Sequence, residues 1–319
     1  MILFITNKED VTVDIIVNKL NERSIPYYRF NTEELVGEIE VTFDFEHDAV
    51  YLYEKRKELK IDLNDIDSVY FRRAKLPELH SLSDVSEAEK NYLKKESFYL
   101  LQGIYDFLSV KYWLNDYWAI RKAENKIFQL QLARKIGFKV PDSLITNCID
   151  SAEKFIKEKE CIIKPIKTGA IDGSSKNIFT SILSPRAELD RIQFFPSFFQ
   201  QHIKKKADIR VTIVGDQFFS AQINSQDRED TEVDWRAGNS MRLEYNHIEL
   251  PGNIINKCKE FMQCLGLNYG ALDFILEPSG SFTFLEINPN GQWGWIENRL
   301  NLQISDAIID LLLTHEKIS

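Results

Sequence analysis

The stretch "FLEINPNGQW", at residues 284–293, decides the fold and the chemistry expected of this chain. It carries Glu286 and Asn288 two positions apart in an apolar run, which then breaks at Pro289. Successive side chains of a β-strand point to opposite faces, so Glu286, Asn288 and Phe284 are expected on one face. Proline has no N–H to donate to a strand ladder, so the strand should end there. The pattern predicts a carboxylate and an amide side by side at a strand end.

The residues before this stretch predict its partner strand. "GALDFILEPSGSFTFLEIN", at residues 270–288, is typical of a hairpin with a Glu-Pro-Ser-Gly turn. With an even-length loop, Asp273 lies opposite either Glu286 or Phe284, and the two acids face the same side in both registers.

Two carboxylates on a mostly apolar face repel each other and lose hydration, so they need a cation or a proton. Asp273, Glu286 and Asn288 offer hard oxygen ligands, which suit Mg²⁺ better than zinc. The three residues are therefore the candidate metal ligands. An alternative stays open at this point: Asp273 is a solvated residue on an exposed sheet face, and Glu286 and Asn288 only shape a turn.

Length and composition restrict the class of protein. A chain of 319 residues suits two or three packed units, and no apolar run approaches the roughly 20 residues that span a bilayer. The net charge of −9 argues against a nucleic-acid surface, which needs a basic face. The start, "MILFITNKED", predicts a strand and not a signal peptide, and the cysteines form no CxxC pair. We expect a cytoplasmic protein that binds neither membrane nor nucleic acid.

The first 112 residues predict an α/β domain. "ILFIT", "VTVDIIVNKLNER" and "IPYYRFN" give a β-α-β opening, and "FDFEHDAVYLYEK" alternates as a hairpin does. Residues 84–110 predict a long amphipathic helix. Its expected packing stripe is Tyr92, Phe98, Leu101, Tyr105 and Leu108.

Two further units are expected, at residues 113–199 and 200–319. The first has a helix stopped at Gly137, a strand entered through Pro141, and the strand "ECIIKPI" followed by the loop "KTGAIDGSSKN" and the strand "IFTSIL". The second has the hairpin "DIRVTIVGDQFFSAQI", the carboxylate hairpin and a final helix, "SDAIIDLLLTHE". The fold class predicted is α/β, with α+β character.

Several lysines are candidate phosphate ligands. Lys164 lies inside the apolar run "CIIKPI", where it either contacts nucleotide phosphates or extends to water from a strand end. Lys126 has the same two interpretations. Lys167 opens a small, hydroxyl-rich loop whose backbone N–H groups could close over phosphates, although neither GxxxxGK[ST] nor GxGxxG is present. The run of lysines at 204–206 predicts a solvated turn.

The segment "FFQQHIKKKADIRVTIVG" carries further candidates. Residues 200–203 could present polar groups along an adenine edge. Asp208 and Arg210 share a face of a regular strand, so Arg210 either binds an anion or pairs with Asp208. Arg236, in "EVDWRAG", is a second candidate anion binder, with an Asp234–Arg236 pair as the alternative.

Taken in order, these residues resemble an ATP-grasp ligase over about residues 113–313, and the first domain resembles the βαβ pre-ATP-grasp domain that such enzymes usually carry. The motif "EINPNGQW" with the downstream "LQISDAIIDLLL", together with "DWR" and "VYFRRAKLP", is similar to the graspetide (microviridin-type) ligases that macrocyclise ribosomal precursor peptides. The fold implied is therefore ATP-grasp.

The resemblance also implies ATP and Mg²⁺ as cofactors and assigns roles by position. One departure is visible, because many relatives have Glu in place of Gln201 and an aromatic residue in place of His202. The assignments are Lys126, Lys164 and Lys167 at the ATP phosphates, Gln201, His202 and Ile203 at the adenine with Asp208 in the same site, Asp273, Glu286 and Asn288 on Mg²⁺, and Arg210 and Arg236 as catalytic residues at the γ-phosphate and the activated acid.

The function implied is an ATP-dependent ligase that activates Glu or Asp side chains of a precursor peptide as acyl phosphates. It then forms ω-ester macrocycles with Thr or Ser, or ω-amides with Lys. Arg72 and Arg73 are expected to serve acidic parts of the leader-bearing peptide, with a solvent-exposed strand end as the alternative, and relatives suggest a homodimer. Two other functions stay open: a ligase that adds a free amino acid to a peptide or small acid, and a nucleotide-binding module without turnover.

Overall fold

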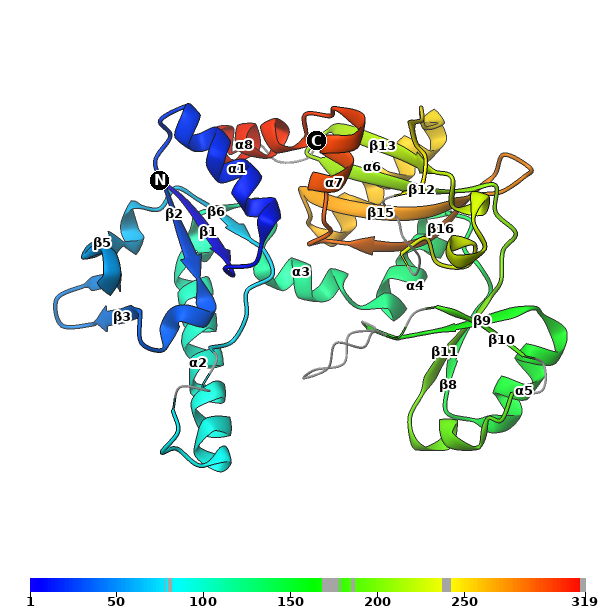
Figure 1. The fold of residues 1–319 in the computed structure, drawn as a ribbon, viewed down its shortest axis with the longest axis horizontal. Coiled ribbons are helices and arrows are strands. Elements are labelled where there is room, and N and C mark those ends of the chain that lie inside the picture. Colours follow the sequence, from blue (N-terminus) through cyan, green and yellow to red (C-terminus); the bar gives the residue numbers. More distant parts are fainter. Residues whose placement is uncertain are drawn as a thin grey trace.

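The first unit of the chain contains two small sheets (Figure 1). The structure is a computed structural model that describes residues 1–77, 79, 82–167, 178, 180–184, 187–236 and 242–315. The sheet order β2-β1-β6-β7 is parallel throughout, and α1 (Val11–Glu22) makes the crossover between its first two strands. The predicted β-α-β opening is confirmed. The strands of the parallel sheet are β1 (Ile2–Thr6), β2 (Tyr27–Asn31), β6 (Ser68–Phe71) and β7 (Tyr112–Trp113), and the antiparallel sheet has β3 (Ile39–Asp44), β4 (Ala49–Glu54) and β5 (Leu59–Asp62).

Helix α2 (Glu87–Phe107) is shorter than expected, and fewer of its predicted packing residues are buried. It begins at Ser86 with a capping box to Glu89, in which each side chain bonds to the other residue's backbone N–H. Its C-terminal half packs on the first unit, whereas its N-terminal half projects away from the sheets (Figure 1). The predicted stripe is therefore wrong at Tyr92 and Phe98, which are 62% and 38% exposed.

The central unit is an antiparallel sheet with the order β10-β9-β11-β8. Its strands are β8 (Ser143–Thr146), β9 (Cys161–Lys164), β10 (Ser181–Leu183) and β11 (Ser197–Gln201), with α5 (Ile149–Glu158) against them. Before it come α3 (Tyr117–Ala123) and α4 (Lys126–Ile136), and α4 ends at Gly137 with a φ of 90°, as predicted. The expected unit boundary at residues 199 and 200 falls inside β11, which belongs wholly to this sheet.

The C-terminal unit is a five-stranded antiparallel sheet with the order β14-β13-β12-β15-β16. One face is covered by α4 and α6 (Gly252–Leu265), whose buried side chains meet Phe274 and Phe284. The strands are β12 (Ala207–Val214), β13 (Gln217–Ile223), β14 (Tyr245–His247), β15 (Tyr269–Leu276) and β16 (Phe282–Asn288).

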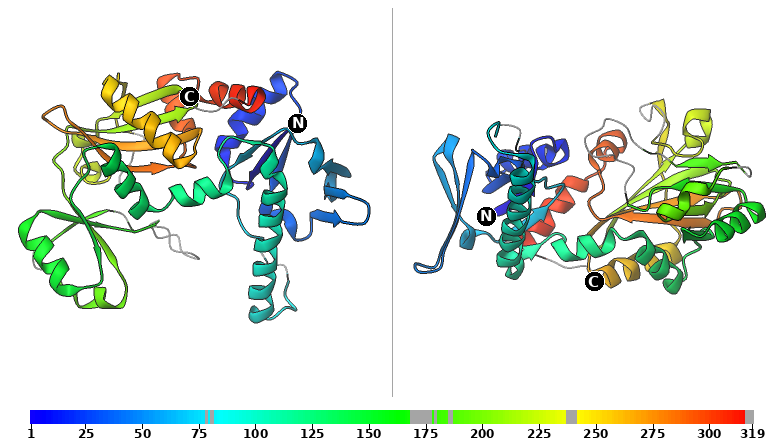
Figure 2. Two further views of the ribbon diagram at one scale, coloured as in Figure 1. Left: turned by 180° about the vertical axis from the view of Figure 1, so that it is seen from behind. Right: turned by 90° about the horizontal axis from the view of Figure 1, so that it is seen from below.

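The last two helices return to the first unit. Helix α7 is Gly294–Leu300 and α8 is Ile304–Thr314, and Figures 1 and 2 show α8 beside α1. Their apolar faces share one core, and Lys19 donates to Asp306 at 2.7 Å. The first unit and the C-terminal sheet are therefore packed together through these helices.

The carboxylate hairpin has one irregularity. Asp273 pairs with Glu286, but Phe274 pairs with Phe284, so Leu285 is an extra residue in β16. This bulge turns Phe284 into the apolar core while Glu286 faces the opposite side. The expectation that Phe284 shares a face with Glu286 is therefore wrong.

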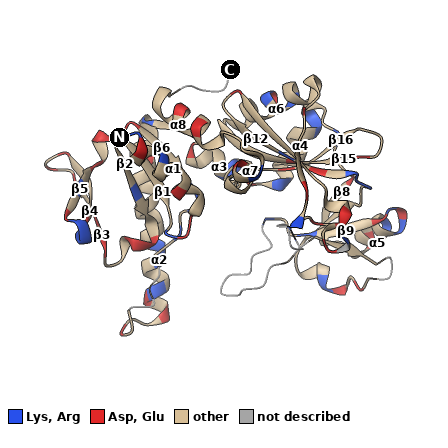
Figure 3. Ribbon diagram, turned by 45° about the horizontal axis from the view of Figure 1, so that its top comes forward, with Lys and Arg blue, Asp and Glu red and all other residues tan. Residues whose placement is uncertain are grey.

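Charged residues of both signs are interspersed over all three units (Figure 3). Among the helices that the structure describes, none is long and apolar enough to cross a membrane.

Candidate active site

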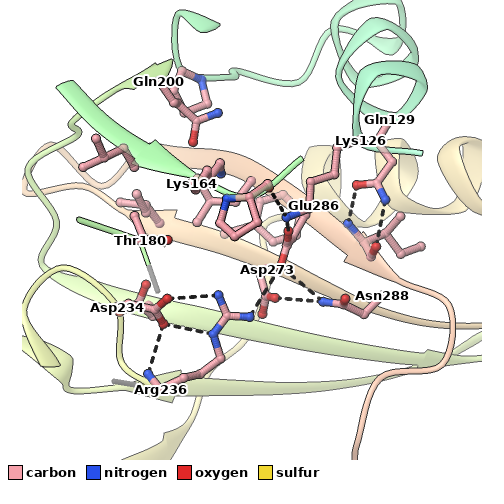
Figure 4. A pocket seen from close by; sticks show the side chains of 18 of the residues that line it. Lys126, Gln129, Lys164, Thr180, Gln200, Asp234, Arg236, Asp273, Glu286 and Asn288 are labelled. Carbon is pink, nitrogen blue, oxygen red and sulfur yellow. Dashed lines mark hydrogen bonds and ion pairs between the residues drawn. The ribbon is translucent and has the colours of Figure 1, made fainter. Parts of the chain in front are cut away.

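A cavity of about 440 Å³ lies between the central and C-terminal sheets. Its size falls within the range of about 300–1,000 Å³ that is usual for ligand sites. Figure 4 shows its side chains coming from both sheets and from the start of α4. The predicted site residues that line it are Lys126, Lys164, Lys167, Gln201, His202, Ile203, Asp208, Arg236, Asp273, Glu286 and Asn288.

Three neighbouring strands place the charges at its floor. Arg210 on β12 pairs in register with Asp273 on β15, which pairs with Glu286 on β16. The Arg210 guanidinium donates to both Asp273 oxygens at 2.8 and 2.9 Å. Lys126 Nζ lies 3.0 Å from Glu286 Oε2, and Arg236 Nη1 lies 3.6 Å from Glu286 Oε1. Each buried carboxylate thus has a cation of its own.

Neighbouring positive charges offset the effect of burial on the pKa more fully for Glu286 than for Asp273. Burial raises the pKa of Glu286, but the charges of Lys126, Arg236 and Lys164 outweigh this and hold the pKa at about 2. Burial raises the pKa of Asp273 and is only partly offset by Arg210. Glu286 is therefore ionised at neutral pH, and Asp273 would gain from a further cation.

The donor set at this point fits Mg²⁺. Asn288 Nδ2 lies 3.3 Å from Asp273 Oδ2 and 3.5 Å from Glu286 Oε1, so the amide already adjoins both acids. Rotation of the amide by half a turn brings its oxygen to the same place, and each carboxylate has about four acceptor positions. Within the described ranges no three His, Cys, Asp or Glu residues gather as a metal site, so two carboxylates and an amide are the candidate set.

Lys164 faces the same space from the end of β9. It lies over the Phe198 ring, 5.0 Å from the centroid. Burial lowers the pKa of Lys164 to about 8, with Glu286 opposing the shift and Lys126 and Arg236 adding to it. Three cations, Lys126, Lys164 and Arg236, line this part of the cavity, which suits a polyanion.

The lowered pKa of Lys164 predicts a pH dependence of nucleotide binding. Below about pH 8 the ammonium is charged and attracts phosphates, and above it the proton is lost. The affinity for ADP, measured by calorimetry without added metal, should be constant up to about pH 8. It should then fall by up to about tenfold for each further pH unit. Lys164→Arg keeps its charge above pH 8. If the affinity of that variant for ADP fell equally with pH, the pH dependence could not be assigned to Lys164.

The alternative pairings turn out differently for the two arginines. The Asp208–Arg210 pair is not formed, because Asp208 pairs with Lys205 at 2.7 Å and Arg210 with Asp273. Arg210 lies behind Asp273, so its place at the γ-phosphate stays a prediction. Arg236 does pair with Asp234, at 2.9 Å, and its half-exposed guanidinium also faces the cavity.

The run of lysines at 204–206 contains a residue that the sequence did not single out. Lys205 is only 5% exposed in its side chain, donates to the carbonyl of Val233 at 3.3 Å and lines the cavity. The predicted solvated turn is therefore wrong for this residue. Asp208, three residues later, was the available signal, since a buried carboxylate needs a partner.

The residues predicted to contact adenine also line the cavity. His202 Nδ1 is 3.0 Å from Glu160 Oε1, and the backbone N–H groups of Gln201 and His202 donate to the backbone carbonyl oxygens of Asp142 and Glu160. Nearby walls are apolar and come from both sheets: Ile162, Ile203, Ile275 and Leu285. Gln201 to Ile203 thus border the cavity, and their contact with adenine stays a prediction. Most of the predicted phosphate loop, residues 168–177, lies outside the described part of the chain, while Lys167 borders the cavity.

The residues after Asn288 are held through their carbonyl groups. Asn115 donates to Pro289 O at 3.0 Å, Arg72 donates to Gly291 O at 2.9 Å, and the Tyr269 hydroxyl donates to Gly291 O at 2.6 Å. This is why the strand end carries "NPNG": the loop turns sharply and exposes carbonyls to buried donors. The loop in turn fixes the end of β16 that bears the candidate metal ligands.

Arg72 is therefore not a peptide-binding residue in this structure. Its side chain is fully buried, pairs with Asp10 at 2.9 Å and reaches the carbonyls of Asn290 and Gly291. The expectation for Arg72 was wrong because the charge, seen in the sequence alone, could as well face inward. Arg73 is exposed, and its role toward a peptide stays a prediction.

Gly291 has no room for a side chain. A Cβ there would lie 2.6 Å from Ala271 Cβ, 3.1 Å from Arg210 Nη2 and 3.3 Å from Asn288 Cβ. Gly291→Ala should lower the free energy of unfolding by about 1–3 kcal/mol, since the hairpin must spread. It should also raise the Mg²⁺ concentration needed for half-maximal activity. Gly103→Ala, with nothing within 4 Å of the added carbon, is the matched control in urea denaturation. Equal effects of the two variants on stability would contradict the conclusion that Gly291 has no room for a side chain.

Two more positioning residues were missed in the sequence. Gln129 on α4 donates to Ile287 O and accepts from Ile287 N, both at 3.0 Å, and thus pairs with the free edge of β16 between the two metal-ligand positions. Asn115 accepts from the N–H groups of Asn268 and Tyr269 at 2.9 Å. Both are amides that satisfy backbone groups, a role that leaves no motif in a single sequence.

Comparisons with known proteins agree with this geometry. Residues 123–292 match the family model of the ATP-grasp domain, and residues 1–121 match that of the MvdD pre-ATP grasp domain. Among solved structures, an ATP-grasp ligase of Chryseobacterium gregarium, RiPP-associated and in complex with ADP and a leader and core peptide, is 29% identical, with a TM-score of 0.89 over 99% of this chain and 97% of that one.

Two macrocyclases from Microcystis aeruginosa MRC are also similar. MdnC, bound with the precursor peptide MdnA, is 27% identical, with a TM-score of 0.86 over 99% of this chain and 100% of its own. MdnB is 29% identical, with a TM-score of 0.82 over 98% of each chain. Among curated proteins no significant match was found.

Proposed function

Because the chain belongs to the ATP-grasp family of ligases, we propose that it uses ATP to join side chains within a ribosomal precursor peptide. Glu or Asp carboxylates of the peptide become acyl phosphates, and a Thr or Ser hydroxyl, or a Lys amine, then displaces phosphate. The product is an ω-ester or ω-amide macrocycle. Two similar solved structures support the peptide substrate, since MdnC was solved with a precursor peptide and the C. gregarium ligase with a leader and core peptide.

One observation carries the proposal. Glu286 is a buried, ionised carboxylate at the meeting point of Lys126, Lys164 and Arg236, and it adjoins Asp273 and Asn288. ATP and a peptide carboxylate are both anions, so they repel each other unless cations lie between them. A site that gathers several cations around one ionised carboxylate, together with oxygen ligands for a divalent ion, is what this encounter needs.

The charged residues of the site have different roles in this reaction. Lys126 and Lys164 bind the phosphates, Arg236 faces the acid that attacks, and Arg210 holds Asp273 in place. A peptide carboxylate oxygen attacks the γ-phosphorus and ADP leaves. The hydroxyl or amine then attacks the acyl carbon, releases its proton and expels phosphate. Mg²⁺ on Asp273, Glu286 and Asn288 would neutralise charge on the phosphates.

The proposed site of action is the cytoplasm, which supplies ATP and keeps thiols reduced; all four cysteines are free thiols in the structure, in keeping with this proposal. The homodimer expected from the resemblance stays a prediction, which light scattering of the purified protein would check.

The test uses peptides rich in Thr or Ser and in Glu or Asp that are encoded in reading frames beside that of the chain. Incubation with ATP and Mg²⁺ should release one ADP and remove one water from the peptide for each bond formed, as mass spectrometry would show. ADP release that responds only to free amino acids would select the amino-acid ligase instead. Stabilisation by ATP without phosphate release in the presence of any acid would indicate a nucleotide-binding module.

A further inference from the structure

The segment that carries Arg236 is irregular. Between β13 and Arg236 the described chain forms two short 3₁₀ turns, Ser225–Asp227 and Glu229–Thr231. Asp234 Oδ1 accepts from the backbone N–H of Arg236 at 3.1 Å and from its Nε at 2.9 Å, as Figure 4 shows. These bonds fix the guanidinium to its own segment. Its distance of 3.6 Å from Glu286 therefore depends on what holds the segment against the rest of the protein.

Trp235, between Asp234 and Arg236, joins the segment to helix α7. Its ring packs on that of Trp295, with the centroids 5.2 Å apart and the planes inclined by 43°. Trp295 also meets Tyr245 of β14 edge-on, at 5.4 Å between centroids. Aromatic pairs prefer a small set of offset and inclined arrangements, so such a contact fixes the orientation of a segment as well as its distance.

Helix α7 is also tied to the candidate metal ligands. It follows directly on the loop 289–293, which begins after Asn288. Trp293, the last residue of this loop, is fully buried, and Trp295 packs against the same apolar core, which α7 shares with α1 and α8. One helix therefore holds the end of β16 through the chain itself and the segment of Arg236 through the pair of tryptophan rings.

We propose that Trp295 is a positioning residue for the ligase reaction: by stacking on Trp235 it holds Arg236 beside Glu286, where the guanidinium meets the carboxylate of the peptide. The inference rests on the proposed function and adds the contact that keeps its anion-binding arginine in place. Trp295 lies outside the described wall of the cavity, so the effect of its replacement must pass through another residue.

Trp295→Leu should lower kcat/KM for the precursor peptide by about a hundredfold, the usual effect of a misplaced reacting or binding group. The affinity for ADP, measured by calorimetry, should not change, because Lys126 and Lys164 stay in place. Trp295→Phe keeps a ring against Trp235 and should recover most of the rate. Trp118→Leu is the matched control, because Trp118 is half-exposed, packs on the ring of Tyr117 and lies outside the described cavity wall.

A double variant separates positioning from a general structural effect. If Trp295 acts through Arg236, adding Trp295→Leu to Arg236→Ala should lower kcat/KM by no more than about a further twofold, since coupled residues are not additive. A second loss of about a hundredfold on that background would show that the two residues act independently, and the inference would be overturned. Wild-type kcat/KM in a folded Trp295→Leu would overturn it as well.

Circular dichroism tests the ring contact without turnover. Two indole rings in contact couple their electronic transitions, so the wild-type spectrum should contain a pair of bands of opposite sign that is lost in Trp295→Phe and kept in Trp118→Leu. A spectrum unchanged by Trp295→Phe would overturn the inference. Thermal unfolding checks that each variant is folded, and Trp235→Leu removes the same contact if Trp295→Leu is not. A wild-type protein that releases no ADP with any peptide would instead overturn the proposed function.

Discussion

Glu286→Gln should lower the rate of peptide-dependent ADP release by about a thousandfold, because it removes a charge that the site is built to use. Glu286 is held ionised by Lys126, Arg236 and Lys164, and it lies directly opposite Asp273. The glutamine keeps the shape of the side chain but carries no charge for a divalent ion. The affinity for peptide, measured by fluorescence anisotropy, should remain close to that of the wild-type protein.

Glu277→Gln is the control for this variant. Glu277 lies beyond the end of β15, pairs with Lys139 at 2.6 Å and is not part of the cavity wall. It is a carboxylate of the same hairpin, and its replacement should leave the rate of ADP release almost unchanged. If Glu286→Gln turned over at the wild-type rate, the assignment of Asp273, Glu286 and Asn288 to a metal ion would be abandoned.

Arg72→Met should lower the free energy of unfolding by about 3–5 kcal/mol, the usual cost of leaving one partner of a buried ion pair alone. The variant leaves Asp10 with a buried and uncompensated charge, and it removes the donor to the carbonyls of Asn290 and Gly291. Chemical denaturation followed by circular dichroism would measure the change. Activity should fall as well, since the loop that follows Asn288 loses its anchor in the first unit.

A double variant separates the two parts of this effect. Arg72→Met with Asp10→Asn removes the lone charge and keeps the cap of α1, where the Asp10 side chain accepts from Thr12 N. It should recover part of the lost stability. The exposed Arg73→Met should change stability by less than about 0.5 kcal/mol. If Arg72→Met were as mild as Arg73→Met, Arg72 would not hold the loop.

The sequence predicted the residues of the candidate site better than it predicted how side chains pack. Alternation along the hairpin was enough to bring Asp273, Glu286 and Asn288 to one side, because that face is set by the period of a strand. The bulge at Leu285 was not predictable, since an extra residue leaves the apolar pattern looking regular. The position of Phe284 was therefore assigned to the wrong face.

The sequence identified the charged side chains but not the direction in which each of them points. The sequence singled out Arg72 as a cation but gave no sign that it points into the core toward Asp10, 62 residues away. A run of three lysines usually lies in solvent and so predicts an exposed Lys205, whereas the side chain is buried against Asp208. On α2, periodicity predicts a buried stripe, but the N-terminal half of the helix projects away from the sheets, so Tyr92 and Phe98 remain exposed.

The reaction itself offers the most direct test of the central claim, that a peptide carboxylate attacks ATP before the bond is made. Precursor peptide with its Glu and Asp carboxylates labelled in heavy oxygen is incubated with the protein, unlabelled ATP and Mg²⁺. Each phosphate released should carry one labelled oxygen, because the acyl phosphate leaves with an oxygen from the acid. Macrocyclic peptide formed together with unlabelled phosphate would show that the carboxylate is never phosphorylated, and the account would be wrong.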